Sequence, residues 1–96
     1  MTAYVIFIRE EPYTDQAAIA EYTRLAIAGM HPKANPVVMT QAPIEAFEGE
    51  APDGVVMVAF PTIEDAKEWY NSPGYQAAIP WRQKGSNYRV FLVPGR

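Results

Sequence analysis

Hydrophobic positions along the chain change between strand-like and helix-like spacing, and these changes predict the order of its elements. Four segments rich in β-branched and aromatic residues are the predicted strands: Ala3–Arg9, Val37–Thr40, Val55–Phe60 and Tyr88–Val93. Residues Ile44–Phe47 are expected to continue the second strand after a break at Pro43. The Gly- and Pro-containing acidic stretch that follows is a predicted turn into the third strand.

A long helix is predicted between the first and second strands. Apolar residues recur there every three or four positions, which predicts a helix through about Ala28. Thr14 and Asp15 are the candidate N-cap residues, because a short oxygen-bearing side chain can accept from the free N–H groups of the first turn. Gly29 is the expected C-terminal stop.

Two further helices are predicted between the third and fourth strands. The first begins after Thr62, with Asp65 at capping-box spacing. The second is short: Ser72 is its predicted N-cap, Pro73 fits its first helical position, and Pro80 is expected to end it.

These assignments give the order β-α-β-β-α-β with one additional short helix, which is a ferredoxin-like α+β fold. At 96 residues the chain is expected to form a single domain, residues 1–96, with a four-stranded antiparallel sheet and its helices on one face. The first, third and fourth strands are apolar on both sides, so both faces of the sheet require cover. We therefore expect a homodimer packed sheet to sheet, with a cavity between sheet and helices.

Composition argues against several classes of function. The net charge of −3 and the scattered lysines and arginines argue against a nucleic-acid partner. The chain has no cysteine and one histidine, so neither thiol chemistry nor a metal site is expected. It has no long apolar segment and no secretory signal, so a soluble cytoplasmic protein without membrane contact is expected. Phosphate-binding loops and dinucleotide fingerprints are missing, and no cofactor is expected.

Short motifs in the second half are the most specific feature of the sequence. They are Phe47-Glu48-Gly49, Val58-Ala59-Phe60-Pro61-Thr62, Trp69-Tyr70-Asn71-Ser72-Pro73 with Tyr75-Gln76, and a distal Arg82. In this combination the chain resembles the DUF1330 family, small proteins of the dimeric α+β barrel superfamily that are named for a domain of unknown function. The resemblance implies the fold and dimerisation but no particular chemistry. The first half departs from the family pattern of a Gly-Gly pair followed by a strand ending in Arg, because it reads Gly29-Met30-His31-Pro32 and Val38-Met39-Thr40-Gln41.

Four polar residues near the second and third helices are candidates for the wall of a ligand pocket: Asn71, Ser72, Tyr75 and Arg82. Arg82 could bind a carboxylate through two hydrogen bonds, and Tyr75 could donate to a developing oxyanion. A structural alternative stands beside this interpretation. Asn71 could end one helix, Ser72 could cap the next, and Arg82 could pair with Glu64 or Glu68 on the surface.

Three residues from elsewhere in the chain are further candidates. His31 could act as a general base or as a haem ligand, or it could be a solvated loop residue beside a helix end. Glu48 could face the cavity as an acid or base, or simply begin a polar turn. Tyr22 lies on the apolar stripe of the first helix, where its hydroxyl needs either a ligand or a backbone carbonyl as its partner. Trp69 is assigned to the core.

Two functions of different classes follow from these candidates. The first is a non-catalytic dimeric domain that binds a small metabolite between sheet and helices, with Tyr22, Tyr75, Arg82, Asn71 and Ser72 as ligand contacts. The second is a cofactor-independent enzyme of isomerase, lyase or monooxygenase type, with His31, Glu48 and Tyr75 as candidate catalytic groups. Convergence of these side chains on one cavity would favour the enzyme, and their dispersal would argue against it.

Overall fold

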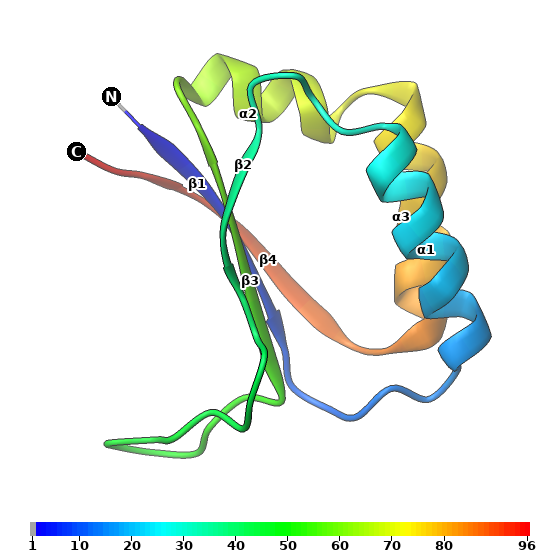
Figure 1. Ribbon diagram of the computed structural model, residues 1–96, viewed down its shortest axis with the longest axis vertical. Helices are drawn as coiled ribbons and strands as arrows, with labels where there is room; N and C mark the ends of the chain where they lie inside the picture. Colours follow the sequence, from blue (N-terminus) through cyan, green and yellow to red (C-terminus); the bar gives the residue numbers. More distant parts are fainter. Residues whose placement is uncertain (1) are drawn as a thin grey trace.

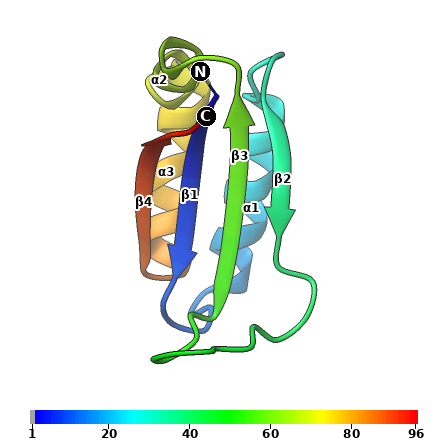
Figure 2. The same cartoon turned by 90° about the vertical axis from the view of Figure 1, so that its left-hand side faces the viewer.

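The computed structural model describes residues 2–96 and shows an antiparallel sheet with two long helices packed on one face (Figure 1). Its elements are β1 (Ala3–Arg9), α1 (Gln16–Ala28), β2 (Asn35–Met39), β3 (Gly54–Phe60), α2 (Ile63–Tyr70), α3 (Pro73–Gly85) and β4 (Tyr88–Pro94). The strands lie in the order β2-β3-β1-β4, and α2 lies at the end of the sheet that holds both termini (Figure 2). The predicted ferredoxin-like α+β architecture is confirmed.

The core lies between the sheet and the helices. Alternate residues of β1, namely Ala3, Val5 and Phe7, are buried against the helix layer. They pair with Phe60, Val58 and Val56 of β3, so the two central strands present one continuous apolar surface to the helices. Ala66, Trp69, Tyr75 and Ala78 cover this surface from α2 and α3.

The three helices begin at the residues that the sequence indicates. The Asp15 carboxylate accepts from the Ala18 N–H at 3.0 Å and caps α1. Thr62 accepts from the Asp65 N–H at 3.0 Å and caps α2, and Ser72 accepts from the Tyr75 N–H at 3.3 Å and caps α3. Each bond satisfies one free N–H group of a first turn.

The prediction that Pro80 ends the third helix is wrong, because α3 continues through Pro80 to Gly85. A proline inside a helix costs about 3 kcal/mol, since it removes one hydrogen bond and crowds the preceding turn. Burial offsets this cost: Ala78, Arg82 and Gly85 are buried residues of α3, and α3 packs along the length of α1. The second half of the helix therefore exists because of tertiary packing.

The prediction that Ile44–Phe47 continues the second strand is also wrong. The hairpin of β2 and β3 closes where the Thr40 N–H donates to the Val55 carbonyl at 3.1 Å, so residues 41–53 have no strand opposite them. This connection projects from the sheet on the side away from the helices (Figure 1). Phe47 within it is 95% exposed.

The opposite face of the sheet carries no helix (Figure 1). Ile6 of β1 lies at its centre and pairs with Met57 of β3 on one side and Phe91 of β4 on the other. Neighbouring pairs on the same face are Tyr4 with Ala59 and Ile8 with Val55. The predicted two-sided apolar sheet is therefore present, and in a single chain only one of its faces is covered.

Candidate ligand-binding site

Arg82 is the most unusual side chain of the helix layer. It is 4% exposed, and its Nε and Nη1 atoms are buried without a hydrogen-bond partner. Among residues 2–96 no carboxylate forms an ion pair with it, so the predicted surface pairing with Glu64 or Glu68 is wrong. The cause is the continuation of α3, which carries Arg82 to the buried side of the helix.

Aromatic rings surround the Arg82 guanidinium. Its Cζ atom lies 5.7 Å from the ring centroid of Phe7, 6.0 Å from that of Tyr22 and 5.6 Å from that of Tyr88. Cations are attracted to ring faces at such distances, by about 0.5–2 kcal/mol for each contact. The rings therefore hold the cation in place without supplying the acceptor oxygens that a guanidinium normally bonds.

Two tyrosines complete this cluster. The hydroxyl groups of Tyr22 on α1 and Tyr75 on α3 lie 2.8 Å apart in a hydrogen bond, and their rings meet edge to face. Tyr75 is fully buried, whereas Tyr22 borders an open cavity. Tyr75 thus positions the Tyr22 hydroxyl, and the sequence candidates Tyr22, Tyr75 and Arg82 lie in one cluster.

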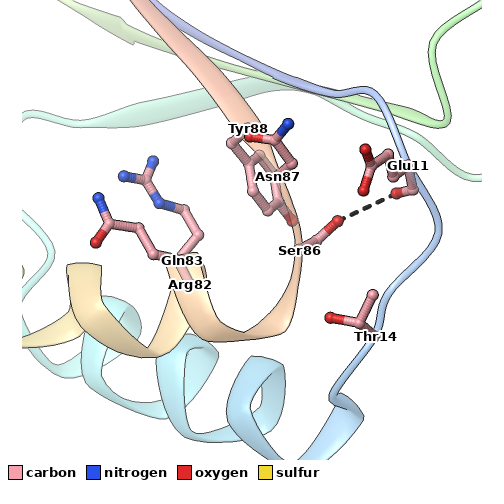
Figure 3. A pocket seen from close by; sticks show the side chains of 7 residues that line it. All are labelled: Glu11, Thr14, Arg82, Gln83, Ser86, Asn87 and Tyr88. Atoms are coloured by element: carbon pink, nitrogen blue, oxygen red, sulfur yellow. Dashed lines mark hydrogen bonds between the residues drawn. The ribbon is translucent and has the colours of Figure 1, made fainter.

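Two hollows meet at this cluster, and Tyr88 lines both. The first, of about 240 Å³, is mainly apolar and lies between α1 and the sheet, where its walls include Phe7, Ile19, Tyr22, Val58, Trp69 and Tyr88. The second, of about 400 Å³, is polar and is lined by Glu11, Thr14, Arg82, Gln83, Ser86, Asn87 and Tyr88 (Figure 3). Figure 3 shows the Arg82 guanidinium directed away from α3, close to Tyr88. Arg82 itself lines the polar hollow, and its ring neighbours Phe7, Tyr22 and Tyr88 line the apolar one.

The wall of the polar hollow is fixed by hydrogen bonds between the ends of distant elements. The Ser86 hydroxyl donates to the Glu11 carbonyl at 3.1 Å, and the Thr14 hydroxyl donates to the Gly85 carbonyl at 3.2 Å (Figure 3). These bonds tie the segment before α1 to the end of α3. The entrance to the site is thus built from loops that are held in place.

The tyrosines of the cluster stay protonated at neutral pH. Burial raises the pKa of Tyr75, and the neighbouring Tyr22 raises it further. Burial likewise raises the pKa of Tyr22 and of Tyr88. Their hydroxyl groups are therefore hydrogen-bond donors and not bases, and together with Arg82 they form a surface that suits an anion.

His31 and Glu48, the other two catalytic candidates, lie outside the cluster. The His31 Nδ1 accepts from the Lys33 N–H at 3.1 Å, so Nε2 carries the hydrogen and donates to Glu68 Oε1 at 2.9 Å. The histidine thereby joins the end of α1 to α2. Glu48 is exposed in the connection between β2 and β3 and lines neither hollow.

Asn71 and Ser72 have structural bonds at the junction of α2 and α3. The Asn71 Nδ2 donates to the Lys67 carbonyl at 3.0 Å, and the Ser72 hydroxyl donates to the Trp69 carbonyl at 2.7 Å in addition to its capping bond. Neither residue lines the two hollows at Arg82. Asn71 borders a separate hollow of about 300 Å³ beside β4.

Trp69 is a wall residue of the apolar cavity that the sequence assigns only to the core. It is 3% exposed, and its indole Nε1 is buried without a hydrogen-bond partner. The position of Trp69 on the apolar stripe of α2 predicts that its ring is buried. Periodicity does not predict whether the indole N–H has a hydrogen-bond acceptor.

In residues 2–96 no three His, Asp or Glu side chains gather closely enough to hold a metal ion. None of the helices α1, α2 and α3 has the length and hydropathy of a membrane span.

Several solved structures share this fold at low sequence identity. A protein of unknown function from Rhodopseudomonas palustris is 17% identical, with a TM-score of 0.70 over 99% of this chain and 83% of that one. A dimeric ferredoxin-like protein of unknown function from Jannaschia sp. CCS1 is 13% identical, with a TM-score of 0.67 over 99% and 100% of the two chains. SnoaB, a cofactor-independent oxygenase from Streptomyces nogalater, is 12% identical, with a TM-score of 0.60 over 99% and 92%.

Sequence comparison supplies the family. No curated protein matches the chain. The profile described as Domain of unknown function (DUF1330) matches residues 2–96, which is essentially the whole sequence, and the predicted resemblance is therefore confirmed. The chain belongs to the DUF1330 family, whose fold it shares with dimeric ferredoxin-like proteins and with a cofactor-independent oxygenase.

Proposed function

We propose that this protein binds a small organic acid with an apolar body. The observation that supports this proposal is Arg82, a buried cation with two unpartnered nitrogen atoms that lines the polar hollow and is packed against rings that line the apolar one. A carboxylate on the ligand would accept hydrogen bonds from the guanidinium. The apolar part of the ligand would fill the cavity lined by Phe7, Tyr22 and Trp69.

Energetics favour an anionic ligand over a purely structural role for Arg82. Burying an ion costs several kcal/mol in a protein unless it is paired and hydrogen-bonded. The three ring contacts of Arg82 lie near the distance limit of the cation–π attraction and offset only part of that cost. A carboxylate would supply the missing charge, and hydrogen bonds to charged groups contribute about 1.5–3 kcal/mol.

Binding is favoured over acid–base catalysis at this site. Proton abstraction needs an acceptor group within hydrogen-bond reach of the substrate. Glu11 is the only carboxylate-bearing residue that lines either hollow, and it belongs to an exposed loop. The remaining polar side chains of the polar hollow are amides and hydroxyls, which are weak bases. The cofactor-independent enzyme predicted as an alternative would therefore need Glu11 as its base.

The charge preference of the site can be tested with matched probes. Benzoate and benzamide have nearly the same shape, so a difference in affinity measured by calorimetry or NMR titration reports the charge. We expect benzoate to bind more tightly than benzamide. The Arg82→Met substitution should lower the affinity for benzoate roughly tenfold to a hundredfold and leave the affinity for benzamide unchanged. Lys84→Met, which removes an exposed cation from the same helix, is the matched control.

The result that contradicts the proposal is equally specific. If acid and amide bind alike in the unaltered protein, or if Arg82→Met and Lys84→Met lower benzoate affinity to the same extent, Arg82 is not the counterion of a bound anion. The proposal would also be contradicted if none of the tested acids bound at millimolar concentration.

We further propose that two copies associate through the bare face of the sheet. The dimeric ferredoxin-like neighbour supports this, as does the apolar patch centred on Ile6, Met57 and Phe91. Ile6→Glu would place a charge at the centre of the patch and is expected to give a monomer in analytical ultracentrifugation. Ala77→Glu, on the exposed side of α3, is the control and should not change the mass. A stable monomer of the unaltered protein at micromolar concentration would refute the dimer.

A further inference from the structure

A second buried donor without a partner belongs to a residue that lines the cavity assigned to the ligand by the proposed function. The Trp69 side chain lines the apolar cavity, and its Nε1 is the one unpartnered side-chain atom outside Arg82 among the buried groups of residues 2–96. Buried N–H groups of tryptophan normally find an acceptor. An indole N–H that has no acceptor, on a residue of a cavity wall, therefore requires an explanation.

Packing fixes the indole in place. Its ring centroid lies 4.2 Å from that of Tyr75, 5.4 Å from that of Phe60 and 6.4 Å from that of Tyr70. The ring cannot turn to find a protein acceptor without disturbing these contacts. A phenylalanine would give similar aromatic packing without a polar atom, so packing alone does not account for an N–H group here.

Trp69 and Arg82 are both neighbours of one aromatic ring. The Phe7 centroid is 6.2 Å from the Trp69 centroid and 5.7 Å from the Arg82 Cζ. Phe7, Trp69 and two tyrosines next to Arg82, Tyr22 and Tyr88, line the same cavity. A cation and a neutral donor thus both lie next to Phe7.

We propose that the ligand carries a second, uncharged acceptor at the end opposite its carboxylate, and that Trp69 Nε1 donates to it. A carbonyl or ether oxygen fits this role, because it accepts a hydrogen bond without requiring a counter-charge in the apolar part of the cavity. The ligand class is therefore an aromatic or cyclic acid with an oxygen acceptor remote from the acid group. This inference rests on the proposed binding of an organic acid at Arg82.

Two probes of nearly the same shape separate this inference from the binding of acids in general. In 4-acetylbenzoate a carbonyl oxygen replaces one methyl group of 4-isopropylbenzoate, and the carboxylate is the same. We expect the acetyl compound to bind roughly three- to tenfold more tightly to the unaltered protein. In Trp69→Phe this preference should disappear, because both probes then meet only an apolar ring. The ratio is measured within each variant, so a general loss of affinity cancels.

A spectroscopic measurement tests the same contact without altering Trp69. The chain has two tryptophans, so Trp81→Phe leaves Trp69 as the single indole N–H in a nitrogen-labelled sample. Its proton resonance should move downfield on addition of 4-acetylbenzoate. Addition of 4-isopropylbenzoate to the same sample should not produce that shift.

The outcomes distinguish the two proposals. If both probes bind through Arg82 with equal affinity and leave the indole proton resonance in the same position, the role of Trp69 is wrong and the acid site stands. If neither probe depends on Arg82, the acid site fails and the role of Trp69 fails with it. A preference for the acetyl group that survives in Trp69→Phe would also overturn the assignment of the donor.

Discussion

The hydroxyl groups of Tyr22 and Tyr75 lie 2.8 Å apart and join α1 to α3 through a hydrogen bond inside the helix layer. The two residues are 53 positions apart in the sequence, so the bond depends on the packed arrangement of the two helices. It fixes the Tyr22 hydroxyl at the cavity that adjoins Arg82. Burial of the two hydroxyl groups makes the stability of the protein sensitive to high pH.

Three of the six tyrosines should resist ionisation in the folded protein. Burial raises the pKa of Tyr22, Tyr75 and Tyr88 above the ordinary value of about 10. The folded state therefore holds protons that the unfolded state releases above about pH 10, and stability should fall as the pH rises beyond that point. Tyrosinate absorbance should show a delayed group of three tyrosines that ionise with unfolding. Ionisation of all six in one early step without unfolding would contradict this.

Removing one hydroxyl of the tyrosine pair should cost more than removing both. Tyr22→Phe leaves the Tyr75 hydroxyl buried without a partner, which costs about 1–3 kcal/mol of unfolding free energy. The double variant Tyr22→Phe, Tyr75→Phe removes both polar groups and should recover most of that loss. Denaturant unfolding of the two single variants and the double variant measures the coupling. Strictly additive losses would mean that the hydroxyls do not interact.

Arg82→Met should raise the stability of the ligand-free protein or leave it unchanged. Methionine fills a similar volume between the rings of Phe7, Tyr22 and Tyr88 and removes an unpaired buried charge. Urea unfolding should therefore show a midpoint at or above that of the unaltered chain. The same variant is thus expected to be at least as stable as the unaltered protein and to bind benzoate more weakly. A loss of several kcal/mol would instead show that Arg82 stabilises the fold.

Gly85→Ala should destabilise the protein by about 1–3 kcal/mol. A Cβ at this position would collide with the Ile19 side chain and approach the Asp15 carbonyl oxygen to 3.2 Å. The matched control is Gly74→Ala in the first turn of the same helix, where the added carbon would meet only the Gly29 Cα at 3.4 Å. Thermal unfolding should show a lower midpoint for the first variant and little change for the second. Equal midpoints would mean that α1 and α3 move apart without cost.

The order of the elements could be predicted from the sequence because the signals that set it are local. Continuous runs of β-branched and aromatic residues define β1 and β3, and the side chains of Asp15, Thr62 and Ser72 mark the helix starts that the structure confirms. Pro80 shows where local signals fail. Its local preference to end a helix is outweighed by packing against α1, which no pattern around Pro80 reports.

The composition of the site was less predictable for the same reason. With α3 ending at Pro80, Arg82 would lie on the surface, so its burial among three rings could not be foreseen. The unpartnered Trp69 Nε1 depends on the distances to every neighbouring acceptor, which a sequence does not contain. Tyr22 could be found from helical spacing, and Tyr75 from the motif that begins at Trp69.

The two edges of the sheet are poorly suited to pairing with strands of another chain, whereas its bare face is suited to packing against another sheet. Pro36 in the edge strand β2 lacks an N–H donor, a bulge interrupts the pairing between Pro36 and Val38, and Pro94 ends the other edge strand β4. Such features hinder the addition of further strands. In the proposed dimer, face-to-face packing would cover the one bare face of each copy and leave none for a third. The proposed assembly is therefore a closed pair, which would not grow into a fibre.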